Sequence, residues 1–204
     1  MRTRLAAVGL MAVFVGATVV SSQTATQTKP PAKTTAAAPK AAPCALKTAQ
    51  SALPATDEDK IASALCAAPA SIAKGAAVVD VPSMKVLKPG TNGWTCMPDA
   101  SAGGPMCLDK NGMDWAAAWM GHKDPPKDKM ALGYMLMGAS DASNTDPFAT
   151  EPKPGEKWVA TGPHLMVLNI GDHFDGYPTS ATNTKVPYVM FAGTPYAHLM
   201  IPVK

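Results

Sequence analysis

The fold is decided by the stretch Gly162-Pro-His-Leu-Met-Val-Leu-Asn-Ile170, in which a turn-forming Gly-Pro pair precedes a run of mostly apolar residues. A short apolar run bounded by turn residues predicts a β-strand, here over residues 164–170. The same pattern returns at His198-Leu-Met-Ile201, within a second predicted strand over residues 197–203. These two matching strands indicate that the C-terminal half of the chain is mostly β-structure.

Further strands are predicted on both sides of the first one. They cover residues 77–81, 84–87, 94–96, 130–137, 158–161 and 188–192. The segments 77–96 together predict a small antiparallel unit, with a Pro-Gly turn inside it. Residues 138–155 are polar and interrupted by prolines, so they are predicted to form a loop.

Two short helices are predicted from their capping residues. Thr56 is followed by three acidic residues and then by apolar residues at helical spacing, and Pro69 ends this pattern. Asp109 is expected to cap a second helix that stops at Gly121. Along one face of that helix lie Met113, Ala116, Ala117 and Met120. The predicted class is α+β, with a predominantly antiparallel β sheet or small barrel and two short helices.

The first 22 residues are expected to be a signal peptide. Arg2 and Arg4 precede an apolar run of 16 residues, 5–20, which falls short of the ~20 residues that a membrane-spanning helix needs. The sequence therefore predicts an exported protein, periplasmic or secreted, with no membrane span after signal cleavage.

The remaining chain is expected to hold a linker and one domain. Residues 23–55 consist almost entirely of Ala, Thr, Pro, Lys, Gln and Ser, a composition that cannot form a core. Residues 56–204 have the length of a single globular domain, and they carry 12 Lys against 15 Asp and Glu, a net charge of −3. Because proteins that bind nucleic acids present a basic face, this charge argues against a nucleic-acid partner.

The four cysteines are expected to form disulfides. Cys96 and Cys107 flank a turn-rich segment, where a bridge would pin a surface loop. Cys44 and Cys66 remain as a second pair, which would tie the end of the linker to the first helix. Four cysteines allow three pairings, and local spacing favours this one in an oxidising compartment.

The repeated His-Leu-Met pattern indicates a candidate metal site. Alternation along a strand places His164 with Met166 on one face, and His198 with Met200 on one face. If the two strands are neighbours, two imidazoles and two thioethers converge, and these ligands suit copper, with thioethers favouring the cuprous ion. His173, Met135 and Met137 are further candidate ligands. The alternative interpretation is core packing, because methionine commonly fills irregular apolar space.

The loop around residue 143 offers other chemistry. Asp141, Ser143 or Asn144, and Asp146 could bind calcium, and Ser140 or Ser143 could act as a nucleophile with a distant histidine. Neither reading has a specific signature, since the loop has neither an EF-hand glycine and glutamate nor a nucleophile elbow. Local turns that fix the backbone are the simpler interpretation of these residues.

Four strings resemble a family of short exported bacterial proteins of unknown function. They are Gly90-Thr-Asn-Gly-Trp-Thr-Cys-Met-Pro98, Met137-Gly-Ala-Ser-Asp-Ala-Ser-Asn-Thr-Asp-Pro147, Gly162-Pro-His-Leu-Met166 and Gly193-Thr-Pro-Tyr-Ala-His-Leu-Met-Ile-Pro202. The resemblance implies a single exported domain that begins within residues 72–79, with the preceding cysteine-bearing piece as an extension. It implies no activity, cofactor or site residue.

These observations predict an exported binding domain that is not an enzyme, with a soft-metal site of copper type as the most specific version. A periplasmic hydrolase that uses His164 or His198 as its base is the alternative from another class. A structural or stress protein of the cell envelope, with no small-molecule site, is the third reading.

Overall fold

The computed structural model describes Cys44 and residues 52–81, 83–100 and 103–203. The predicted signal peptide and most of the predicted linker therefore lie outside the described residues. All of the described residues belong to one compact unit, Lys40–Lys204. Among them, no helix combines the length and the apolar character that a membrane-spanning segment requires.

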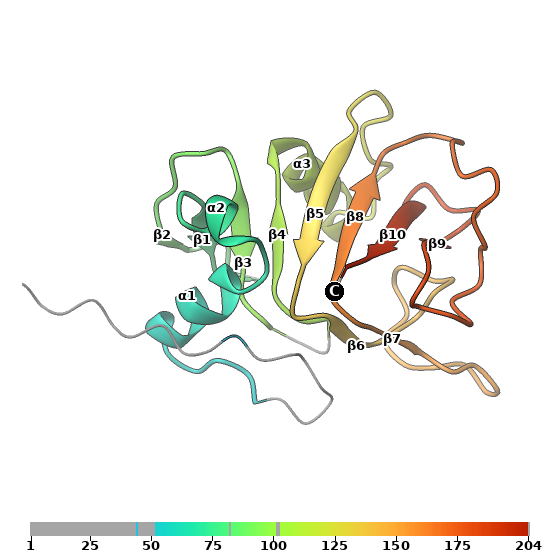
Figure 1. Cartoon of the computed structure of the whole chain (residues 1–204), viewed down its shortest axis with the longest axis horizontal. Helices are drawn as coiled ribbons and strands as arrows, with labels where there is room; N and C mark the ends of the chain where they lie inside the picture. Colours follow the sequence, from blue (N-terminus) through green and yellow to red (C-terminus); the bar gives the residue numbers. More distant parts are fainter. Residues whose placement is uncertain (1–43, 45–51, 82, 101–102, 204) are drawn as a thin grey trace, which may run out of the picture. The chain divides into compact units, whose positions relative to one another are not determined.

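An open sheet of eight strands forms the centre of this unit, and a separate pair of strands accompanies it (Figure 1). The order in the large sheet is β2-β1-β3-β4-β5-β8-β10-β9, and all neighbours are antiparallel except β1 and β3. The strands of the described residues are β1 (Ala77–Val79), β2 (Val86–Lys88), β3 (Thr95–Met97), β4 (Met106–Leu108), β5 (Ala131–Met135), β6 (Ala139–Ala142), β7 (Val159–Thr161), β8 (His164–Leu168), β9 (Tyr188–Met190) and β10 (His198–Pro202). The predicted α+β class with a predominantly antiparallel sheet is confirmed, and the sheet is open rather than closed into a barrel.

The first helix begins and ends where the capping residues predict. In α1 (Asp57–Leu65), the backbone N–H of Asp59 donates a hydrogen bond of 3.1 Å to the side-chain oxygen of Thr56. A further single turn, α2 (Ala70–Ala73), follows Pro69 and was not predicted. The segment before residue 72 is thus folded onto the sheet, because Ala64 and Ala67 in it are fully buried.

The third helix, α3 (Lys110–Met120), is fixed to the sheet through its capping residue. The Asp109 carboxylate accepts hydrogen bonds from the backbone N–H of Gly112 at 2.7 Å and of Leu132, on β5, at 3.0 Å. Ala116, on the face expected to hold the apolar residues, is buried together with Trp115, whereas Met120 at the end of that face is 46% exposed. Burying the large indole removes more apolar area from water than burying the terminal methionine.

The predicted loop over residues 138–155 is corrected at its start, where β6 pairs with β7. Ala139 and Ala142 of β6 pack against the main core, and the pairing contains a register shift between them. Small side chains and an irregular ladder leave only a weak alternation in the sequence, which explains why the strand was missed.

The two faces of the large sheet bury different cores. On one face, α3 covers a core that includes Ala131 and Met135 of β5. On the other face, α1 and α2 cover a smaller core against which Tyr134, also of β5, packs. Figure 1 shows α1 and α2 in front of β1 to β3, with α3 behind β4 and β5.

Both disulfides join the pairs that cysteine spacing favours, Cys44 with Cys66 and Cys96 with Cys107. Cys66 is the residue that follows α1. Cys96 and Cys107 lie directly opposite each other on β3 and β4 and are fully buried in the smaller core, so the bridge joins the two strands that flank the turn-rich segment.

Candidate functional site

The two His-Leu-Met segments lie side by side, because β8 and β10 are antiparallel neighbours. Met166 is directly opposite Met200, His164 is opposite Pro202, and His198 is opposite Leu168. Directly opposite residues of an antiparallel pair share a face, so all four predicted ligands lie on the face that α3 covers.

The register nevertheless places the two histidines at opposite ends of the methionine pair. Pro202 is the residue opposite His164, and it lies four residues after His198 on β10. Four residues correspond to about 13 Å along a strand. The paired methionines lie between the two histidines. The structure therefore brings Met166 and Met200 together and leaves each histidine beside a different set of neighbours.

The ring of His164 is held in a defined tautomer by the backbone. Its Nδ1 lies 2.7 Å from the carbonyl oxygen of Gly162. Because a carbonyl oxygen only accepts, Nδ1 carries the proton and Nε2 presents its lone pair. Burial lowers the pKa of this fully buried ring, which keeps it neutral, and its Nε2 has no hydrogen-bond partner among the described residues.

Two methionines are neighbours of His164 in the sheet. Met135 on β5 is directly opposite His164, and Met166 follows two residues along β8 on the same face. Both side chains are buried, with 5% and 6% of their surface exposed. Of the additional candidate ligands, Met135 therefore joins this group, whereas His173 is exposed and lies in a turn.

His198 has the same tautomer but aromatic surroundings. Its Nδ1 lies 2.9 Å from the carbonyl oxygen of Tyr196. Trp115 and Phe191 meet its ring edge to face, with ring centroids 5.6 and 5.5 Å away. Burial lowers the pKa of His198 to about 4, although the backbone hydrogen bond opposes this shift, and a charge on His164 would lower it further. The sequence did not identify Trp115 or Phe191 as neighbours of this ring, because the contacts are non-local.

The polar loop after β6 uses its side chains to fix its own backbone. The Ser143 hydroxyl donates to a Glu156 carboxylate oxygen at 3.1 Å and accepts from the backbone N–H of Asp146 at 3.0 Å. One Asp146 carboxylate oxygen accepts from the backbone N–H of Phe148, and the other lies 3.7 Å from the Lys153 ammonium. In the part of the chain that the structure describes, no three His, Cys, Asp or Glu side chains are grouped to hold an ion.

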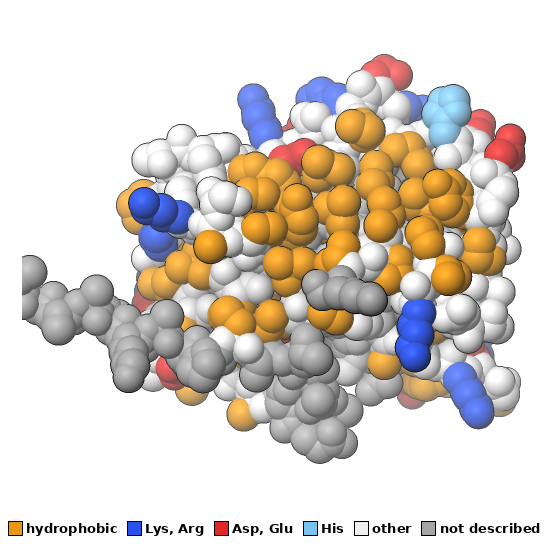
Figure 2. Space-filling view, in the orientation of Figure 1, with side chains coloured by type: hydrophobic (Ala, Val, Ile, Leu, Met, Phe, Trp, Pro, Cys, Tyr) orange, Lys and Arg blue, Asp and Glu red, His pale blue; other side chains and the backbone are white. Residues whose placement is uncertain are grey.

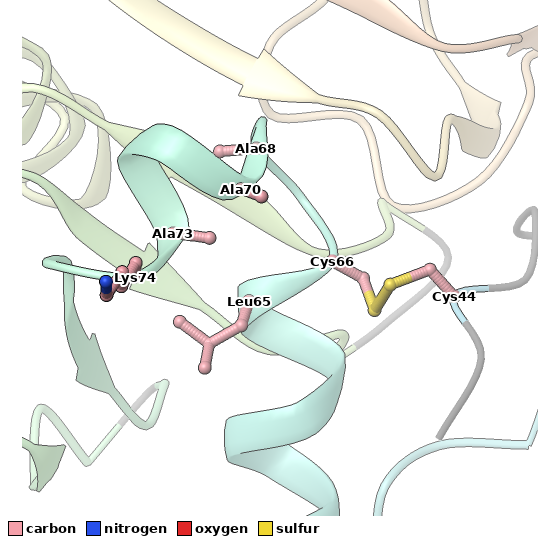
Figure 3. A pocket seen from close by; sticks show the side chains of 7 residues that line it. All are labelled: Cys44, Leu65, Cys66, Ala68, Ala70, Ala73 and Lys74. Carbon is pink, nitrogen blue, oxygen red and sulfur yellow. A yellow bond between two sulfur atoms is a disulfide. The ribbon is translucent and has the colours of Figure 1, made fainter. Parts of the chain in front are cut away.

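A separate hollow of about 410 Å³ lies beside the Cys44–Cys66 disulfide, at the junction of α1 and α2 (Figure 3). Among the described residues, Leu65, three alanines and the disulfide form most of its lining, and Lys74 supplies the one charged group. This lining lacks the convergent polar groups that orient a ligand or catalyse a reaction. The hollow is therefore not the candidate site.

Comparison with protein-family models, with curated proteins and with solved structures finds no match to this chain. The interpretation of the site therefore depends on its own geometry. In that geometry, the strongest candidate site is the group around His164, which lies beside one end of the Met166–Met200 pair and has an unpartnered Nε2.

Proposed function

We propose that this chain is an exported protein that binds a soft metal ion of the cuprous type, with His164 Nε2 and the thioethers of Met135 and Met166 as ligands. Met200, which lies opposite Met166, is the further thioether of the group. His198 belongs to the surrounding core rather than to the ligand set. The observation that carries the proposal is the unpartnered, buried Nε2 of His164.

An orphaned polar atom in the core needs an explanation. Leaving a buried donor or acceptor unsatisfied costs about 1–3 kcal/mol, so such atoms are rare in native structures. The lone pair of His164 Nε2 is oriented by the Gly162 carbonyl, as in metal-binding histidines whose other nitrogen donates to a backbone carbonyl. A metal ion would satisfy this lone pair.

The neighbouring atoms select the class of ion. Calcium and magnesium prefer oxygen ligands, whereas thioethers and a neutral imidazole suit Cu(I). Burial keeps His164 neutral, so no proton has to leave Nε2 before an ion binds.

Export supports this assignment as an independent consideration. The leader-like first 22 residues and the two disulfides fit an oxidising compartment outside the cytoplasm. The hydrolase alternative gains no support from Ser143, whose hydroxyl bonds to Glu156 and to the local backbone. Both candidate histidine bases are also almost fully buried, at 0% and 2% exposure, away from any substrate in solvent.

The test is a competition titration of the purified, oxidised protein with Cu(I) against a colorimetric chelator. We expect submicromolar affinity in the wild type and at least a tenfold loss in Met135→Leu and in Met166→Leu. These substitutions remove sulfur while nearly conserving volume, so the fold should persist. The matched control is Met97→Leu, a buried methionine on β3 in the same core but three strands away from β8.

Equal affinity in all four proteins, or no Cu(I) binding by the wild type, would reassign the methionines to core packing. The envelope-protein reading without a small-molecule site would then be the better one. A loss in Met97→Leu equal to that in Met166→Leu would show that the core, rather than a set of ligands, controls binding.

A further inference from the structure

The methionines of the described residues are distributed unequally between the two cores. The main core, on the α3 face of the large sheet, holds seven of them, five buried and two partly buried. The smaller core on the other face contains no methionine among the described residues. Figure 2 shows that other side of the molecule, where apolar side chains gather in the middle. Packing alone gives no reason for thioethers to be confined to one face of a sheet.

Three of these methionines form a row that leads to His164. Met97 on β3 is directly opposite Met106 on β4. The antiparallel register of β4 and β5, continued by one residue, places Met106 opposite Met135. Met135 is in turn directly opposite His164 on β8. The row therefore crosses four neighbouring strands, and it carries a thioether on each strand before the histidine.

Burial increases from Met106 to His164. Met106 is partly exposed, Met135 is 5% exposed and His164 is fully buried. On the other side of His164, the opposite residue is Pro202, whose side chain has no atom that could bind a metal ion. Within the row, thioethers therefore connect the histidine with the surface on the β4 side alone.

A cuprous ion needs a ligand at every stage of its way into an apolar core, because a charge without solvent or ligands is very costly there. Neighbouring strands lie ~4.8 Å apart, and metal–sulfur bonds such as Zn–S are about 2.3 Å long. An ion midway between two opposite methionines can therefore contact both sulfurs at once. Three rotatable bonds in each side chain let the sulfur follow the ion.

We propose that Met106 is the entry ligand of the cuprous site, which the ion binds first on its way to Met135 and His164. This inference rests on the proposed function and adds a route to the ligand set named there. The ion forms a bond to the Met135 sulfur while it is still bound to Met106, and it leaves the Met106 sulfur as it binds His164 Nε2. The charge of the ion stays the same, and no proton moves, because the ring proton is on Nδ1.

The route predicts a kinetic effect without a thermodynamic one. Met106 is not a ligand in the final site, so its removal slows binding and release of the ion by the same factor. The equilibrium affinity then stays unchanged. Met135 differs in this respect, because it belongs to the final ligand set and its removal lowers the affinity.

The experiment is stopped-flow transfer of Cu(I) from its bicinchoninate complex to the purified, oxidised protein, with the equilibrium affinity measured on the same samples. We expect Met106→Leu, which nearly conserves volume, to slow the transfer by an order of magnitude or more and to leave the affinity unchanged. The matched control is Met97→Leu, which removes the buried thioether on the far side of Met106 in the same row. Its transfer rate and affinity should equal those of the wild type.

A rescue variant separates ligation from packing. Met106→His restores a ligand that suits copper at the same position, so its transfer rate should stay close to that of the wild type. A purely steric role would leave Met106→His as slow as Met106→Leu, and this result would overturn the proposal. Circular dichroism melts establish that each variant is folded, and Met106→Gln, which has a similar shape and no sulfur, replaces Met106→Leu if that variant does not fold.

The outcomes distinguish the route from the site. An unchanged transfer rate in the folded Met106→Leu, beside submicromolar affinity in the wild type, overturns the route and leaves the proposed function in place. A loss of affinity in Met106→Leu with faster release would make Met106 a ligand of the final site and would likewise overturn its role in entry. Absence of Cu(I) binding by the wild type overturns the proposed function, and the route with it.

Discussion

Thr161 and Tyr188 share a buried hydrogen bond, with their hydroxyl oxygens 2.8 Å apart. The bond joins β7 of the small sheet to β9 at the edge of the large sheet. Burial raises the pKa of the Tyr188 hydroxyl, while the bond to Thr161 opposes that shift. The two sheets are therefore linked by a buried polar contact that involves Tyr188 of the main core.

Removing both partners of this bond should cost less than the sum of the costs of removing each one alone. Tyr188→Phe leaves the Thr161 hydroxyl buried without that partner, so we expect a loss of about 1–3 kcal/mol in the free energy of unfolding. In the double variant Thr161→Val with Tyr188→Phe, both polar groups are absent, and the loss should be smaller than the sum of the single losses. Urea unfolding of the four proteins measures this coupling, and additive losses would contradict it.

Stability should decrease as the pH falls below 6.5. Burial keeps His164 and His198 neutral in the folded protein and lowers the pKa of His198 to about 4, whereas an unfolded histidine takes up a proton near pH 6.5. Between pH 6.5 and about 4 the unfolded state holds a proton on His198 that the folded state lacks, so this residue lowers the free energy of unfolding by about 1.4 kcal/mol per pH unit, and His164 acts in the same direction.

Urea titrations across this pH window measure the slope. His198→Gln should reduce the slope of the free energy of unfolding against pH by the amount that corresponds to about one proton. An identical slope in wild type and His198→Gln would contradict the assignment of His198 as a neutral core residue.

The two disulfides should differ in their resistance to mild reductants. Cys44 is exposed, whereas Cys96 and Cys107 are fully buried. We expect the Cys44–Cys66 bridge to be reduced first under native conditions, as read by alkylation and peptide mass spectrometry. Loss of both bridges at the same rate would contradict this order.

Replacing both buried cysteines should lower stability substantially. A loop of 11 residues contributes ~3 kcal/mol on the chain-entropy estimate, so Cys96→Ala with Cys107→Ala should lower the melting temperature by roughly 6–12 °C. Differential scanning calorimetry checks this value. A melting temperature equal to that of the wild type would mean that packing alone holds β3 against β4.

Gly90 should not tolerate a side chain. A methyl group there would overlap the backbone of Ala76 and Ala77, which cannot move without breaking the start of β1. We expect Gly90→Ala to cost at least about 3 kcal/mol. Gly162→Ala is the matched control, because a methyl group at Gly162 meets no atom within 4 Å. Its effect should stay within about 1 kcal/mol, and equal melting temperatures for the two variants would contradict the difference.

Local signals in the sequence predicted much of the secondary structure. The Thr56 and Asp109 caps set the starts of α1 and α3, because a capping side chain acts within one helical turn. The strands around His164 and His198 were also predicted, although they end earlier than the apolar runs do. Apolar residues continue from these strands into the half-buried turns that follow them, so strand lengths predicted from apolar composition are too long.

Non-local relationships could not be read from the sequence in the same way. The segments 77–96 were predicted to form an antiparallel unit, but β1 pairs in parallel with β3 through Ala77 and Thr95. The register of β8 against β10 decides which of the candidate ligands lie close together, and that register depends on the whole sheet. The position of Met135 opposite His164 likewise follows from the β5–β8 pairing.

The burial of Cys96 and Cys107 also has a consequence for the order of events during maturation. The Cys107 sulfur lies 3.6 Å from the Ala64 carbonyl oxygen, so α1 sits directly over the bridge. An oxidising partner must reach both thiols before α1 docks, or at a moment when α1 has come away. While α1 is docked, it blocks access of oxidants and reductants to Cys96 and Cys107. The oxidation state of the pair is therefore preserved for as long as the helix stays in place.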